Sequence, residues 1–306
     1  CSSSRVSSLT RCAHSRSLNH HRGSSISTVT ATYDHTMSAP EVELRAAWRQ
    51  LVGNANEPRL DQLLDQLLAS HREEHRHYHT ATHVMWVLRH IAHMLAAGEQ
   101  ATDAAAIRLA ALYHDAVYDP SATDNEARSA QLAGEAGAAL GWPAARREVA
   151  QRLVEATAAH QPRDRDEAVL IDADLAILGA SPNDYAAYVR GVRAEYAHVP
   201  ESAWRTSRTA VLRGLLDRPH LITTTCMRDA RDARARANIA AELLFSLCMY
   251  TVLRAFGQDV GYAEVVLVNE FVALFAGMMP VPGGVGVTEA ALTAGFVAIG
   301  VDEATA

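Results

Sequence analysis

The chain has 306 residues, of which 49% are hydrophobic and only 6% aromatic, so it can bury a sizeable core, and its abundant alanine favours packed helices over a sheet. Its formal net charge of −7 argues against a general nucleic-acid binder. The four cysteines are scattered without a CxxC pair, which argues against a disulfide framework or a cysteine-rich zinc site and fits a reducing compartment.

The first 36 residues are rich in serine and arginine and contain no acidic residue before Asp34. This composition, with little apolar periodicity, predicts a disordered leader or a segment resembling a transit peptide. Met37 is followed at once by helix-like sequence. We therefore expect Met37 to be the natural start and the leader to be untranslated or vestigial.

From Glu41 onward, apolar residues recur with helical spacing. Leu44, Trp48 and Leu51 fall on one face, and Gly53 ends the run. Residues 71–78 are polar and are expected to form a loop. Because no alternating strand pattern and no internal repeat is found, the predicted fold class is all-α. The predicted helices cover roughly 41–52, 60–68, 80–98 with Thr80 or Thr82 as the cap, 103–117 with Asp103 as the cap, 124–139, 143–159, 166–179, 183–197, 201–216 and 228–244.

The composition changes near Leu243. From there to the end, Arg254 is the only Lys or Arg, and the uncharged runs Phe271–Thr288 and Ala290–Val301 approach the length that spans a bilayer. Prolines and glycines within 280–286 interrupt these runs, as in a discontinuous membrane helix. We predict a leader at 1–36, a helical domain at 37–243 and a short, partial membrane-type helical segment at 244–306. A buried pair of soluble helices is the alternative for the last segment.

Histidines and carboxylates occur in three apolar segments. His79 and His83 are four residues apart, so both imidazoles would leave one face of a helix. His114 and Asp115 lie in an almost entirely apolar helix, where a buried imidazole and a buried carboxylate require a partner such as a cation. A structural hydrogen bond between them, without metal, is the alternative.

The third apolar segment contains Asp172 and Asp174. Two carboxylates there again require a cation, although one of them would serve equally well as a solvent-facing residue or a helix cap. Imidazole and carboxylate together suit Zn, Mn, Fe or a similar divalent ion, whose open positions can hold and activate water. The other histidines near the first pair are expected to be solvated: His71, His75, His77, His90 and His93.

Four of these residues resemble a known signature. His83, the pair His114-Asp115, and Asp174 are similar in order and separation to the H…HD…D signature of the HD superfamily of metal-dependent phosphohydrolases. The resemblance covers about 38–243. It implies an HD-domain helical bundle for this part of the chain.

Two further likenesses involve the same region. Tyr78-His79 followed by His83 resembles a motif of cyclic-nucleotide phosphodiesterases, but Thr80 stands where that motif usually has Asn, so cyclic-nucleotide specificity is not implied. The chain is also similar to an uncharacterised bacterial group of predicted HD phosphohydrolases. The runs that carry this likeness are Leu112 to Asp119, Asp124 to Glu126, Asp172 to Gly179 and Arg193 to Tyr196.

The HD resemblance implies roles for individual residues. His79 would be catalytic and protonate the leaving oxygen while metal-activated water attacks phosphorus. The metal would be a divalent ion such as Mn, Zn, Fe, Mg, Co or Ni. The implied ligands are His83, His114, Asp115 and Asp174, and the weaker candidates for a second metal or its surroundings are His160, Glu126 and Asp172.

The expected function is therefore hydrolysis of a small phosphoester, a nucleotide or a related molecule, by a cytoplasmic enzyme domain without a nucleic-acid partner. One alternative is an HD-fold metal-binding sensor module tethered to a membrane domain. Another is a di-iron oxygenase of the same superfamily, because His and Asp also suit non-haem iron. The sequence identifies neither the substrate nor the oligomeric state.

The C-terminal segment has a resemblance of its own. The run Pro280 to Ala290 resembles the PxPGGxGxxE segment of the flippase-like membrane family related to lysylphosphatidylglycerol synthases. Only the last portion of such a family is present. The resemblance implies membrane association of this segment. We expect a frameshifted or spliced reading of two neighbouring genes, with a natural fusion as the alternative.

Overall fold

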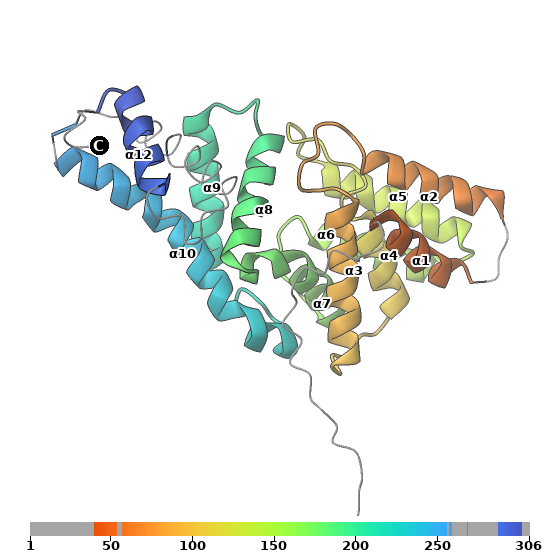
Figure 1. Ribbon diagram of the computed structural model, residues 1–306. Coiled ribbons are helices and arrows are strands. Elements are labelled where there is room, and N and C mark those ends of the chain that lie inside the picture. The colour runs from red at the N-terminus through yellow and green to blue at the C-terminus, as the bar shows by residue number, and fades with distance from the viewer. Residues whose placement is uncertain (1–39, 54–56, 256, 259–267, 269–286, 302–306) are drawn as a thin grey trace, which may run out of the picture. The chain divides into compact units, whose positions relative to one another are not determined.

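The computed structural model describes residues 40–53, 57–255, 257–258, 268 and 287–301 (Figure 1). The predicted all-α class is confirmed, because all regular structure among these residues is helical. The leader, Met37 and the Pro/Gly segment at 280–286 lie outside the described residues. The helices are α1 (Pro40–Val52), α2 (Pro58–Ser70), α3 (Ala81–Ala96), α4 (Ala104–Tyr113), α5 (Asn125–Ala139), α6 (Ala144–Ala156), α7 (Arg165–Asp174), the 3₁₀ helix η1 (Leu175–Gly179), α8 (Pro182–Glu195), α9 (Glu201–Leu216), α10 (Thr225–Ala255) and α12 (Val287–Ala298).

Helix α4 lies in the centre of the core. It packs against α1, α3, α5, α6 and α7 (Figure 1), and its residues from Ala106 to Tyr113 are buried except for Arg108. As predicted, Asp103 caps the helix, and its carboxylate accepts hydrogen bonds from the backbone N–H groups of Ala105 and Ala106. Of the residues that follow α4, His114 and Ala116 are buried and Asp115 is partly buried, so the C-terminal end of the helix lies inside the protein.

Among the predicted helices that end earlier than expected, two end beside predicted metal ligands. Helix α4 ends at Tyr113 rather than at Val117, and a turn closed by the hydrogen bond from Ala116 N–H to the Tyr113 carbonyl follows it, while His114 Nδ1 donates to the carbonyl of Ala111. The predicted helix 166–179 changes from α7 to the tighter η1 after Asp174. Both changes occur beside predicted metal ligands, so these ligands project from helix ends rather than from helix middles.

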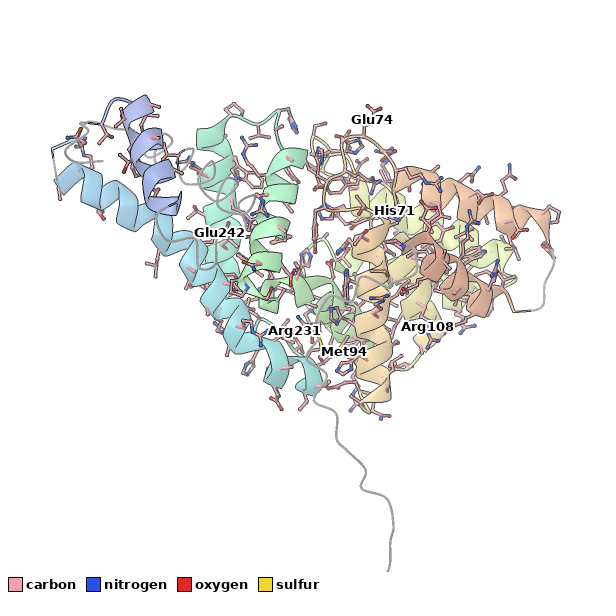
Figure 2. All side chains as sticks on the ribbon, viewed as in Figure 1. His71, Glu74, Met94, Arg108, Arg231 and Glu242 are labelled. Carbon is pink, nitrogen blue, oxygen red and sulfur yellow. The ribbon has the colours of Figure 1, made fainter. Side chains whose placement is uncertain are left out.

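Helix α10 packs closely against η1. A Cβ atom on Gly179 would lie only 2.8 Å from the carbonyl oxygen of Arg231, so only glycine permits this approach. The Arg231 guanidinium (labelled in Figure 2) donates to the carbonyl of Ala176, and the Asn238 amide donates to the carbonyl of Leu178. These contacts fix the chain that directly follows Asp174.

The predicted boundary at 243/244 falls inside α10, which continues to Ala255. Leu243 packs against the main core, whereas Val268, Phe296 and Val301 form a separate small cluster. None of the helices in the described part of the chain combines the length and apolar character needed to cross a bilayer. Helix α12 has 12 residues and so extends only about 18 Å.

These contacts allow the two-part organisation to be tested by truncation. A chain ending after Leu244 keeps the ion pair between Glu242 and Arg208 and the packing of Leu243, so we expect a helical, soluble protein with an unchanged unfolding temperature. A chain ending after Arg236 loses these contacts and should unfold at a lower temperature. Circular dichroism during heating distinguishes the two. If the chain that ends after Leu244 instead unfolds at a lower temperature than the full chain, the C-terminal segment belongs to the core.

Candidate metal centre

His83 enters the centre from the first turn of α3, where it is buried beside Val84 and Val87. Thr80 occupies the N-cap position in an extended conformation. His79 therefore precedes the helix and lies in the loop between α2 and α3. The prediction that His79 and His83 share a helix face is wrong, because the chain leaves the helical conformation at Thr80. The two rings nevertheless remain close, with centroids 5.5 Å apart.

His114 and Asp115 enter from the buried end of α4. His114 Nδ1 donates to the carbonyl oxygen of Ala111 at 2.9 Å, so in a neutral imidazole Nε2 carries the lone pair. This nitrogen lies 3.1 Å from His83 Nε2 and 3.1 Å from Asp115 Oδ2. In its neutral form, His114 thus presents the lone pair of Nε2 to the space shared with His83.

Asp174 completes the set from the end of α7. Its Oδ1 lies 3.1 Å from His83 Nε2 and 3.7 Å from His114 Nε2, while Asp115 Oδ2 lies 3.4 Å from His83 Nε2. Two ligands each about 2.1 Å from one ion, at angles of 90–110°, would be about 3.0–3.4 Å apart. Ligand atoms of His83, His114 and Asp115 all lie within 4.8 Å of one another, which suits one metal ion, and Asp174 Oδ1 lies beside both imidazoles.

The charges in this space also fit a cation. Asp115 Oδ2 is buried and accepts no hydrogen bond of good geometry within the described residues. Burial alone would raise the pKa of Asp115, but the charges of His114 and His79 hold it well below the ordinary range. Burial would lower the pKa of His114, and Asp115 and Asp174 raise it well above the ordinary value. A divalent ion would neutralise both carboxylates and leave the imidazoles free to act as neutral ligands.

The sequence analysis assigned no role to Glu195, at the end of α8. Its buried carboxylate accepts hydrogen bonds from the backbone N–H groups of His77, Tyr78 and His79 at 2.7–2.9 Å. The other oxygen accepts from His79 Nδ1 at 2.7 Å and from the Tyr118 hydroxyl at 2.9 Å. Burial alone would raise the pKa of Glu195, but these donors, His79 first, lower it to about 2. An ionised Glu195 therefore fixes the His79 ring with Nδ1–H toward the carboxylate.

Arg76 is a second residue that the sequence did not single out. Its side chain is fully buried and donates to the carbonyls of His79 at 3.2 Å, Asp115 at 2.7 Å and Ala116 at 3.2 Å. It thereby joins the loop before α3 to the end of α4. Within a run of alternating His, Arg and Glu, no sequence signal separates this buried guanidinium from its solvated neighbours.

The three weaker candidates have different positions. His160 contacts the centre, with Nε2 3.0 Å from Asp174 Oδ2. Asp172 is buried and instead accepts hydrogen bonds from the backbone N–H groups of Thr223 and Thr224, which directly precede α10. Glu126 lies in the first turn of α5. Burial raises the pKa of Tyr196, and the charge of Glu126 adds to that rise.

Among the histidines expected to be solvated, His75, His77 and His93 are exposed. The prediction is wrong for His71 (labelled in Figure 2), which is only 2% exposed and whose ring nitrogens have no hydrogen-bond partner among the described residues. Burial, with the charge of Arg76, lowers its pKa to about 4. Burial likewise lowers the pKa of His90 to about 3. Both histidines are therefore neutral at physiological pH.

Glu195, the partner of His79, lines a cavity of about 550 Å³. Glu195 and Tyr118, which hydrogen-bond to each other, both line it. Its volume is within the range of small-molecule sites, and Ala116, the residue after Asp115, also lines it, whereas His79 and the four predicted ligands do not. Its lining also includes Glu73, His75, Arg128 and His198.

The chain was compared with known proteins. A family model described as "Lysylphosphatidylglycerol synthase TM region" matches residues 237–306. No curated protein and no solved structure matches the chain. The match begins within α10 and covers the C-terminal segment, so it supports the predicted membrane-family likeness and membrane association of that region. The HD resemblance of the helical body stays a prediction.

Proposed function

We propose that the helical body is an HD-type metal-dependent phosphohydrolase that acts on a small phosphoester. The observation that carries this proposal is the convergence of four donor residues, with the nearest pairs of donor atoms 3.1–3.7 Å apart, beside a histidine held by a carboxylate. Two imidazoles and two carboxylates form a ligand set suited to Mn, Fe or Zn.

In the proposed reaction, His83, His114, Asp115 and Asp174 hold the ion. When bound, a divalent ion there would lower the pKa of a coordinated water and polarise the phosphoryl group. His79 donates a proton to the leaving oxygen. Glu195 stabilises the protonated imidazole before transfer and keeps the ring oriented.

The residues around this pair support the assignment. Arg76 holds the carbonyls of His79 and Asp115, so the proton donor and a ligand keep a fixed separation. The adjoining cavity provides room for the leaving group next to Glu195. These features argue for a substrate with the phosphoryl group at the centre and the remainder of the molecule in the cavity.

The C-terminal family match favours a second candidate, a metal-binding sensor module tethered to a membrane. In this case the ion would stabilise the fold without supporting turnover. Metal analysis with an activity assay separates the two. Bound metal that raises the unfolding temperature, without any hydrolysis over a broad set of phosphoesters, would favour the sensor.

The proposed function predicts metal-dependent hydrolysis. Purified protein supplied with Mn²⁺ should release nitrophenol from bis-p-nitrophenyl phosphate, and EDTA should reduce the rate to background. Added Mn²⁺ should restore the rate, whereas Ca²⁺, which prefers six to eight oxygen ligands, should not. A rate that is insensitive to EDTA, or no release with any of Mn²⁺, Zn²⁺, Fe²⁺, Mg²⁺, Co²⁺ and Ni²⁺, would contradict the proposal.

A further inference from the structure

His160 has an unusual backbone conformation. Its φ angle is 48°, and among the described residues it is the non-glycine residue with a positive φ. L-residues with a large side chain rarely adopt this left-handed region, so surrounding contacts must hold it. The residue lies four positions after Ala156, the last residue of α6, at the end of the turns that follow this helix.

Arg218 supplies contacts that hold this backbone. From the end of α9, its guanidinium donates one hydrogen bond to the carbonyl of His160 and another, at 3.2 Å, to the carbonyl of Ala159. Two donors of one rigid fork thus bind two consecutive carbonyls. This arrangement fixes the orientation of the peptide units on which the His160 side chain depends.

Arg218 is itself fixed from α10. The Arg236 guanidinium donates to the carbonyl of Arg218 at 2.6 Å and to that of Pro219 at 2.9 Å. The backbone that carries Arg218 is therefore anchored to a helix that also packs against η1. Within the described part of the chain, Arg218 makes no hydrogen bond or ion pair with the four proposed ligands, and its route to the centre is through His160.

We propose that Arg218 is a positioning residue for the metal centre. By holding His160 in the left-handed conformation, it keeps His160 Nε2 at 3.0 Å from Asp174 Oδ2. Asp174 then presents Oδ1 to His83 and His114. This inference rests on the proposed function only in assuming that the four residues bind metal. Hydrogen bonds to ligating carboxylates commonly change metal affinity by about 10–100-fold.

A double-mutant cycle on the full chain tests the proposal. Arg218→Met removes the donors and keeps most of the side-chain volume, and we expect it to weaken Mn²⁺ binding about tenfold, as measured by electron paramagnetic resonance. His160→Gly permits the same backbone conformation without strain but lacks the imidazole. In that background, Arg218→Met should change Mn²⁺ affinity less than about twofold. Arg213→Met, an exposed position in the last turn of α9, is the matched control.

Each outcome of the cycle decides the inference. If Arg218→Met weakens Mn²⁺ binding equally in the wild-type and His160→Gly backgrounds, Arg218 acts through general packing. If Arg218→Met leaves Mn²⁺ affinity unchanged, Arg218 has no role at the centre. Either result overturns the proposal. Recovery of affinity in Arg218→Ala with low millimolar guanidinium would support it. If the wild-type chain binds no Mn²⁺, the proposed function and this inference fail together. If it binds Mn²⁺ without hydrolysing phosphoesters, only the proposed function fails.

Discussion

Replacement of Asp115 by alanine is expected to abolish both metal binding and phosphoester hydrolysis while the protein remains helical. Asp115 Oδ2 is buried and accepts no hydrogen bond of good geometry from any residue that the structure describes, and it lies 3.1 Å and 3.4 Å from the two imidazole nitrogens. Without this carboxylate, one negative charge and one ligand are lost from a site where a divalent ion needs both. Hydrolysis should fall to the rate measured in EDTA.

The measurement is metal content after dialysis, together with nitrophenol release and circular dichroism. Asp124→Ala is a suitable control, because that carboxylate is 62% exposed and lies on a neighbouring loop. It should keep wild-type metal content and rate. Full activity and full metal content in Asp115→Ala would show that the phosphohydrolase assignment is wrong.

Replacement of His79 by alanine is expected to have a different effect. His79 Nδ1 is bonded to Glu195 and the ring lies beside the proposed ligands, so its loss should slow turnover without releasing metal. General acid catalysis contributes about 10²–10⁴-fold, and we expect a decrease in kcat within that range. Metal content should remain near the wild-type value.

The leaving group provides a sharper test of this role. An alkoxide needs protonation in the transition state, whereas a nitrophenolate departs without it. The decrease in kcat caused by His79→Ala should therefore be large for alkyl phosphoesters and small for nitrophenyl phosphoesters. An equal decrease for both, or a loss of metal in parallel with activity, would indicate that His79 is a ligand or a structural residue.

The helices were largely predictable because apolar periodicity and local caps determine them. Asp103 caps α4 as expected, and the ten predicted helical segments correspond to α1 through α10, with η1 as part of one of them. The rule that buried charges need partners predicted that the three segments would meet, and the HD resemblance selected His83, His114, Asp115 and Asp174 from them. Both the helices and the meeting of these residues were predicted from residue type and spacing, which are read directly from the sequence.

The remaining features of the site depend on tertiary contacts. Glu195 has the spacing of an ordinary residue at a helix end, and its role follows only from the packing of α8 against the loop before α3. The left-handed conformation of His160 depends on Arg218, which is distant in sequence. The burial of His71 arises at the end of α2, beside residues that look polar when read alone. Local pattern does not encode such contacts.

Because α10 is one continuous helix, the number of residues in it sets the rotation of the C-terminal segment about the helix axis relative to the helical body. A flexible linker can gain or lose residues without consequence, but each residue added to an α-helix turns everything beyond it by about 100° and moves it by about 1.5 Å. The contacts of α10 with the helical body reach Leu243, and the same helix continues to Ala255. A single-residue insertion after Leu244 would therefore keep the body intact and change the direction in which the next part of the chain faces.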